Sequence, residues 1–429
     1  MAVAFLDIND SNLQLWYADR QWQSPGYAML DGNSYTFGNS ARSAARLRPR
    51  QINTRFWWQL NTQALQPALG PARHTADLVH AHLLDIHKSG GQPEEILLAV
   101  SSSIGRDQLA LILGIIEQCP FTAVGLVNRS VALASLYGGL GKLYHLEIQL
   151  HQTIISELLE TNGQVELQRT IPLPGCGLLQ LQERLVEIIA AAFIRQTRFD
   201  PRRKADTEQL LYDALPATLL ELQSATEANL EVNGYRARIV RDELIAAGDR
   251  LFSSAADAMG ILTPADRVIL DPLAKLLPGF QQNMPQAEFL GNDALPKALS
   301  PLLENLLQRN ETLNFITALP SSSQHIVPQG NDHKPDTETP ASPSAINNTS
   351  PAPTHLLHGA TAQLLQPSGM AINTTLELYG DSDRWLLRGE LGRNVLVNGL
   401  EYRSGSTLNS GDTITSGQGK TAVLIAVLS

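Results

Sequence analysis

The sequence predicts an α/β protein in which a large block of strands and helices is followed by a flexible linker and a small all-β sandwich. Three observations support this order. Apolar strand patterns alternate with helical patterns through residues 1–319. Residues 320–355 are rich in Pro, Ser, Thr and Asn and have almost no large apolar side chains, which predicts a disordered linker. Residues 356–429 contain only short strand patterns between turn residues.

The block over 1–319 begins with two strands, and its elements then alternate. The segments at 2–6 and 13–17 predict a hairpin, since both are apolar and the turn-forming run DINDSN lies between them. Further along the chain, the apolar spacing predicts a strand over 95–100, a helix over 105–119, a strand over 121–128 and a short helix over 129–138.

A second group of strand patterns follows in the sequence. Residues 143–171 predict an antiparallel meander in which Asn162-Gly163 forms a hairpin turn. The apolar spacing that follows predicts helices over 178–197, 206–223 and 241–259 and a strand over 266–273. Because one group of strands begins near residue 2 and another near residue 143, we expect the block to consist of two similar halves.

Composition excludes several function classes. The chain has 429 residues and a formal net charge of −10, which argues against nucleic-acid binding because phosphates need a basic face. The basic cluster Arg42, Arg46, Arg48, Arg50 and Arg55 is expected to be a solvated surface. The start of the chain lacks the basic region of a signal peptide, and no stretch is long enough for a membrane span. We therefore expect a cytoplasmic protein with no membrane partner.

Several segments of the first block resemble a known family. Residues 36–60 and 96–138, the latter ending in NRSVALASLYG, are similar to the nucleotide-binding domain of DnaK-type heat-shock chaperones, in the actin/sugar-kinase superfamily. Residues 198–216 resemble a helix of some bacterial members. The resemblance implies a two-lobed actin-like domain over 1–319, built from duplicated ribonuclease-H-like halves, in a bacterial protein.

The family's phosphate loops are altered here. The first family loop is D-x-G-[ST], and this chain has Asp7-Ile8-Asn9-Asp10-Ser11, with Asn9 in place of glycine and Asp10 adding a negative charge. The second family loop is D-x-G-G-G-T-x-D, and the matching stretch, 147–154, begins with Glu147 and has none of the glycines. If nucleotide and magnesium bind, the resemblance implies that Asp7, Asn9, Ser11 and Glu147 hold them. The alternative for Asp7 is a cap on the hairpin turn.

The other nucleotide-binding positions differ as well. Asp271-Pro272 replaces the adenosine-side glycine pair, and Gln59 stands where a lysine is expected. The family's N-E-P turn is Asn128-Arg129-Ser130, and Ile154 is expected to fill the phosphate site. We interpret the domain as one that kept the fold and lost ATP turnover, so we assign no catalytic residue, no cofactor and no metal site.

The C-terminal part resembles half of another family. Residues 383–417 are similar to the second half of a forkhead-associated domain, through Asn398-Gly399, Leu408 and Gly411-Asp412. That family binds phosphothreonine with a Gly-Arg pair and an S-x-x-H motif that precede this stretch. The Gly-Arg pair of this chain, Gly392-Arg393, lies inside the stretch and so comes too late in the chain. Strands are predicted over 360–367, 374–380, 384–390, 394–399 and 421–428.

Three functions are compatible with these observations. The first is a DnaK-like pseudo-ATPase that acts as a protein-interaction scaffold or chaperone partner without a peptide-binding clamp, for which an intact DnaK-type chaperone is a candidate partner. The second is a divergent ATP-binding chaperone or ATPase that uses ATP and magnesium. The third is a phosphopeptide-binding adaptor.

Overall fold

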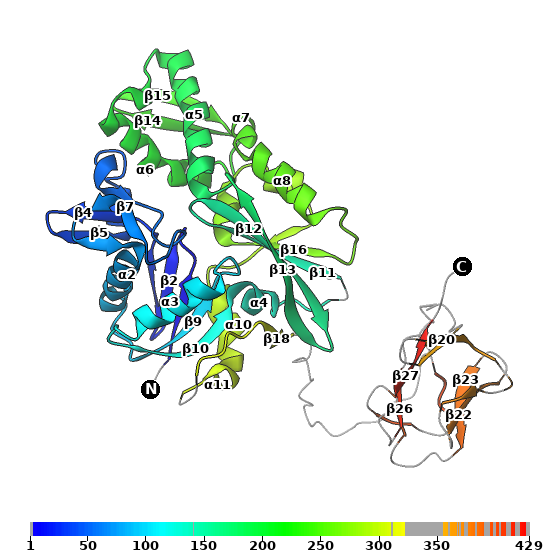
Figure 1. The fold of residues 1–429 in the computed structure, drawn as a ribbon. Helices are drawn as coiled ribbons and strands as arrows, with labels where there is room; N and C mark the ends of the chain where they lie inside the picture. Colours follow the sequence, from blue (N-terminus) through cyan, green and yellow to red (C-terminus); the bar gives the residue numbers. More distant parts are fainter. Residues whose placement is uncertain are drawn as a thin grey trace, which may run out of the picture. The chain divides into compact units, whose positions relative to one another are not determined.

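A computed structural model describes most of the chain, and Figure 1 shows its course. The described residues are 3–139, 141–309 and 312–321 and, further on, 355–358, 361–366, 368, 370–372, 376–381, 384–389, 395–397, 400–402, 405–408, 413–416 and 421–425. The chain divides into two compact units, Met1–Gly330 and Asn331–Ser429, which are described separately. None of the helices in the described parts of the chain has both the length and the apolar character that a membrane crossing requires.

The first sheet of the first unit has the strand order β10-β9-β1-β2-β3. Strand β2 runs antiparallel to both β1 and β3, whereas β9 runs parallel to β1 and to β10. The bounds are β1 Ala4–Ile8, β2 Leu13–Tyr17, β3 Arg20–Ser24, β9 Glu95–Val100 and β10 Thr122–Asn128.

The second sheet repeats this arrangement in the order β17-β16-β11-β12-β13-β18. Strand β12 is antiparallel to β11 and β13, and β16 is parallel to β11 and β17. Each sheet therefore begins with three antiparallel strands and is extended by two parallel ones beside its first strand. The bounds are β11 Lys142–Ile148, β12 Gln152–Thr161, β13 Gln164–Pro174, β16 Arg267–Leu270, β17 Ala287–Phe289 and β18 Ala318–Pro320.

An insertion separates the third and fourth strands of each half. The first insertion holds β4 Ala28–Asp31, β5 Ser34–Phe37, α1 Gly38–Arg42, β6 Ile52–Asn53, β7 Ala64–Leu69, β8 Ala72–His74 and α2 Thr75–Ser89. The second holds α5 Leu178–Thr197, α6 Ala205–Glu221, β14 Glu227–Val232, β15 Tyr235–Val240, α7 Arg241–Leu244 and α8 Asp249–Met259. The remaining α-helices are α3 Arg106–Ile116, α4 Arg129–Ala134, α9 Phe280–Asn283, α10 Ala294–Leu299 and α11 Leu303–Leu306.

Most predicted elements of the first unit are confirmed, and one is wrong. The strand predicted over 95–100 is β9, and the helix predicted over 178–197 is α5. The single helix predicted over 241–259 is instead α7 and α8, separated by a 3₁₀ turn at Ile245–Gly248. Glycine is a poor helix former, and the ring of Phe252 packs 2.6 Å from where a Cβ of Gly248 would lie.

Strand β9 shows how the two sheets share a core. Its side chains are apolar on both faces because both faces are covered. Ile96 and Leu98 join the cluster between the first sheet and helices α2 and α3. Leu97 and Ala99 join a cluster that also contains Leu143, Ile269 and other residues of the second sheet. Helix α4 contacts strands of both sheets and helix α10, so it lies at the centre of the unit (Figure 1).

The second unit is all-β in its described parts. Two antiparallel sheets, in the orders β20-β19-β27-β26-β24-β25 and β21-β22-β23, share one core that includes Leu356, Leu378, Leu387, Leu408 and Ile414. The strands are β19 His355–His358, β20 Thr361–Leu364, β21 Met370–Ala371, β22 Leu376–Asp381, β23 Arg384–Gly389, β24 Val395–Val397, β25 Leu400–Glu401, β26 Thr413–Ser416 and β27 Thr421–Ile425. Most of the predicted linker, and the pairs Gly392-Arg393, Asn398-Gly399 and Gly411-Asp412, lie outside the described residues.

Candidate functional site

Strand alternation places a group of ionisable side chains between the two sheets. On β1, Phe5 faces the core that both sheets share, so Asp7, two residues later, points the same way. On β11, Leu143 faces this core, which turns His145 and Glu147 toward it. The same period-two rule relates Ile269 to Asp271 at the end of β16 and Val127 to Arg129 at the end of β10. All of these ionisable residues are at most 4% exposed.

Arg129 is the centre of this site. It is the first residue of α4, whose N-cap is Asn128, and its guanidinium binds two aspartates in bidentate fashion. Nε donates to Oδ1 of Asp7 at 2.6 Å and Nη2 donates to Oδ2 of Asp7 at 3.1 Å. Nη1 and Nη2 donate to the two carboxylate oxygens of Asp271 at 3.0 and 2.9 Å. This fork geometry is the strongest form of a charge-assisted hydrogen bond.

A third carboxylate completes the cluster. Oε2 of Glu147 accepts a long hydrogen bond of 3.4 Å from Nη1 of Arg129. The other oxygen, Oε1, accepts from Nε2 of Gln149 at 2.8 Å, and this amide nitrogen also lies 2.8 Å from Oγ of Ser101. Glu147 is therefore bound by neighbouring side chains on both oxygens. We call Asp7, Arg129, Glu147 and Asp271 the arginine cluster.

A polar network joins the arginine cluster to α4 and β12. Nε2 of His145 lies 3.3 Å from Oδ1 of Asp271, and Nδ1 lies 2.9 Å from Oγ of Ser130. The hydroxyl of Ser130 donates to Ser156 at 2.9 Å. Each buried polar group here has a hydrogen-bond partner. The site therefore avoids most of the free-energy cost of burying a polar group without a hydrogen bond.

Charge and burial set the protonation of the cluster. Burial raises the pKa of Asp7 to about 6, and the nearby Asp271 and Glu147 add to the effect although Arg129 opposes it. Burial also favours the neutral form of Asp271, but Arg129 and His145 outweigh it and hold its pKa at about 2. Burial disfavours the charge on Arg129, yet the three carboxylates keep its pKa well above the ordinary value. The guanidinium is thus a permanent charge at the centre of the site.

The turn between β1 and β2 docks against the second sheet. Oδ1 of Asn9 accepts from the backbone N–H of Ser11 at 2.9 Å, which closes the turn. Nδ2 of Asn9 lies 3.5 Å from Oδ2 of Asp271 and 3.4 Å from the carbonyl oxygen of Ile148. Oδ1 of Asp10 accepts from the backbone N–H of Leu150 at 2.8 Å. Burial raises the pKa of Asp10 to about 7, although this hydrogen bond opposes the shift.

Two cavities border this turn. The larger, about 460 Å³, is polar on one side, where Asp10, Ser101 and Gln149 lie, and it also contacts Trp58 and Ile154. The smaller, about 230 Å³, is bordered by Ser11 and Asn12 and is otherwise mainly apolar.

The structure brings together some of the residues singled out in the sequence and separates others. Asp7, Asn9 and Glu147 meet at the arginine cluster, whereas Ser11 borders the smaller cavity and donates its hydroxyl to Oδ1 of Asn9 at 2.9 Å. The carboxylate of Asp7 accepts from Arg129 instead of capping the turn, so that alternative is wrong. Arg129 occupies the space between the carboxylates, and Ile154 borders the larger cavity.

Other candidate groups have structural partners. In the basic cluster, Arg46 lies over the ring of Tyr212 at 3.9 Å and 3.8 Å from carboxylate oxygens of both Glu183 and Glu208. Within the described residues, no group of three or more His, Cys, Asp or Glu side chains is arranged to hold a metal ion.

Comparison with known proteins adds no family assignment, because no protein-family model and no curated protein matches the chain.

Proposed function

We propose that residues 1–319 form a duplicated actin-like domain of the DnaK type. The supporting observation is the repeated strand order, in which each sheet has three antiparallel strands followed by two parallel ones beside the first. Each half also carries its insertion at the same place, between its third and fourth strands. A gene duplication accounts for this repetition more simply than two independent origins.

We further propose that the cleft between the halves no longer binds ATP. The single observation that carries this proposal is Arg129, whose guanidinium lies between Asp7 and Asp271 and reaches Glu147. Asp7 and Glu147 are the carboxylates that would organise a hydrated magnesium ion, and both are bound to a cation of the chain itself. A metal ion would have to displace this cation, which would then be buried without its partners.

The loops around the arginine cluster also fit ATP poorly. The backbone N–H of Leu150, which a phosphate oxygen would need, donates to Asp10. Pro272 begins a 3₁₀ helix on the adenosine side and has no N–H to offer. These residues therefore do not suit a nucleotide with magnesium.

The function we propose is that of a DnaK-like pseudo-ATPase of the bacterial cytoplasm that acts as a protein-interaction scaffold or chaperone partner. The second unit would be a further β-module for protein contacts. Linking two binding modules raises the effective concentration of the second for a partner that contacts both. An intact DnaK-type chaperone is a candidate partner.

The test is ATP turnover combined with thermal unfolding of the full chain. A ligand present at a hundredfold excess over its Kd stabilises the native state by about 2.7 kcal/mol, which raises the melting temperature. We expect no phosphate release above background and no melting shift at millimolar ATP and Mg²⁺. Turnover that is lost in Asp7→Asn would contradict the proposal and favour the divergent ATPase.

A further inference from the structure

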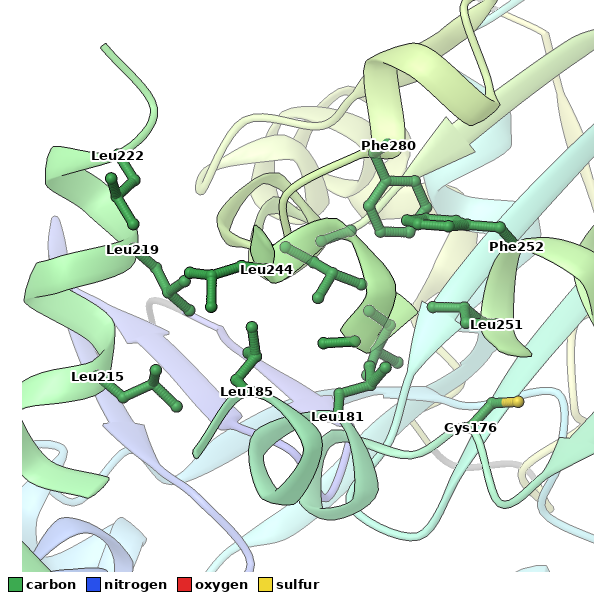
Figure 2. Packing of buried hydrophobic residues seen from close by; sticks show 14 of the residues in the cluster. Cys176, Leu181, Leu185, Leu215, Leu219, Leu222, Leu244, Leu251, Phe252 and Phe280 are labelled. Atoms are coloured by element: carbon green, nitrogen blue, oxygen red, sulfur yellow. The ribbon is translucent and has the colours of Figure 1, made fainter. Parts of the chain in front are cut away.

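The smaller of the two cavities has an apolar interior. Its wall is built from leucines of α5, of α6 and of the 3₁₀ helix at Pro272–Leu276, together with Ile148. Figure 2 shows Leu185 of α5 and Leu215 and Leu219 of α6 with their side chains directed into the space between the two helices. The leucines that border the cavity are Leu178, Leu181, Leu185, Leu215, Leu219, Leu273, Leu276 and Leu277.

The cavity wall also carries polar side chains and one charged side chain. The uncharged polar residues on the wall are Ser11, Asn12, Gln23, Asn39 and Gln182. The hydroxyl of Ser11 donates to Asn9, and the amide of Asn12 donates to Gln23. Among the described residues of the wall, Arg42, the last residue of α1, is the only charged one; it also borders a second cavity, of about 470 Å³.

The guanidinium of Arg42 is available to a ligand. It is half-buried, and among the described residues no side chain forms an ion pair or a hydrogen bond with it. Arg46, one turn away, is by contrast held by Glu183, Glu208 and Tyr212. A half-buried guanidinium without a carboxylate partner, on the wall of a mainly apolar cavity, suits an anion with an apolar tail.

We infer that this cavity binds a small amphipathic monocarboxylate, with its tail among the leucines and its carboxylate on Arg42. An apolar cavity of about 150 Å³ holds one benzene molecule, so 230 Å³ suits a ligand of roughly ten non-hydrogen atoms, such as a medium-chain fatty acid. The carboxylate would accept hydrogen bonds from a planar fork of N–H donors, which suits its two oxygens.

The charge of the surroundings limits the ligand to a single negative charge. Among the described residues of the wall Arg42 is the one cation, whereas Ser11 and Ile148 on the same wall are the chain neighbours of the acidic residues Asp10 and Glu147. A phosphate ester would bring a second negative charge toward these acids with no second cation to balance it. The cavity shares Ser11 and the 3₁₀ helix at Pro272–Leu276 with the loops considered above for ATP, but the inference rests only on the leucines and on Arg42.

The experiment measures binding of octanoate to the full chain by isothermal titration calorimetry. Two further probes separate the contributions: 1-octanol has the same tail without the charge, and acetate has the charge without the tail. We expect saturable octanoate binding, at least about tenfold weaker binding of 1-octanol, and no measurable binding of acetate.

Variants locate the site. Arg42→Gln should weaken octanoate binding about tenfold or more, and Arg42→Lys should recover only part of the loss because it lacks the fork. Arg50→Gln is the matched control, since Arg50 is an exposed arginine of the same segment that does not border the cavity, and it should leave binding unchanged. Leu276→Trp, at a half-buried wall position, should block the cavity while the melting temperature verifies folding.

Three results would overturn the inference. The first is an absence of octanoate binding to the natural sequence at millimolar concentration. The second is octanoate binding that both Arg42→Gln and Leu276→Trp leave intact, which would place the ligand elsewhere. The third is 1-octanol binding as tightly as octanoate, which would mean that the cavity does not recognise the carboxylate.

Discussion

Asp7 and Arg129 lie 122 positions apart in the sequence and are joined by two hydrogen bonds, from Nε to Oδ1 at 2.6 Å and from Nη2 to Oδ2 at 3.1 Å. The same guanidinium forms a second bidentate pair with Asp271, at the end of a strand in the other sheet. One side chain thus connects the first half of the unit to the second. The following predictions depend on this connection and on the packing around it.

Removing Arg129 should strongly destabilise the first unit. In Arg129→Ala the carboxylates of Asp7, Glu147 and Asp271 remain buried without their cation, and loss of one partner of a buried ion pair costs about 3–5 kcal/mol. Denaturant unfolding followed by tryptophan fluorescence measures this loss, since Trp16, Trp22, Trp57 and Trp58 lie in the first unit.

The control for this variant is Arg236→Ala, which removes a solvent-exposed arginine paired with Glu231. Exposed pairs contribute less than about 1 kcal/mol, so its unfolding curve should nearly match that of the natural sequence. Equal losses in the two variants would show that the arginine cluster has no special role in stability.

Asp10 should make the protein less stable as the pH rises. Its pKa is about 7 in the folded state, mainly because it is buried and also because Glu147 is near, against 3.8 ordinarily. The stabilisation linked to its proton is therefore complete below about pH 4 and is lost as the pH rises through about 7. Asp10→Asn stays neutral and keeps an acceptor for the N–H of Leu150, so the variant should gain stability over the natural sequence between pH 4 and pH 8.

The measurement is the free energy of unfolding of both proteins across this pH range. Asp257→Asn, at an exposed position of α8, serves as the control and should give a difference that does not vary with pH. A flat difference for Asp10→Asn would contradict the burial of an ionisable group at this turn.

Gly177 should not tolerate a side chain. It is the N-cap of α5, and a Cβ there would lie 2.3 Å from the backbone carbon of His151. Gly177→Ala must therefore move α5 away from the β11–β12 turn and should lower the melting temperature. Gly114→Ala is the matched change, because Gly114 lies within α3 with open space at its Cβ, and it should stabilise by about 0.5–1 kcal/mol. Equal effects of the two changes would contradict this packing.

Apolar periodicity was sufficient for much of the fold. Strand β9 and helix α5 have the predicted bounds because a continuous buried run and a long amphipathic stretch are strong local signals. The hairpin β14–β15 was not predicted, although Asn233-Gly234 is a favourable turn pair and the burial of β14 alternates strictly. The break between α7 and α8 lies at Ile245–Gly248, where Gly248 is a local signal against a continuous helix that the prediction did not use.

The candidate site was predicted only in part. Asp7, Asn9 and Glu147 were singled out because the resemblance aligns them with the family's phosphate loops, and the structure brings them together. Arg129 was seen in the sequence only as an altered turn residue, because its importance depends on Asp271, which is 142 positions away. His145 gave no signal beyond its place on an alternating strand, since its partners Ser130 and Asp271 are both distant in sequence.

The most direct test of the central claim, that Arg129 occupies the place of a nucleotide with its metal, is isothermal titration calorimetry of ATP and Mg²⁺ with the full chain. The account predicts no saturable heat at nucleotide concentrations up to millimolar, because Asp7, Glu147 and Asp271 are already bound to Arg129. Saturable binding with a Kd below about 100 µM, which Asp7→Asn abolishes while the variant remains folded, would contradict it.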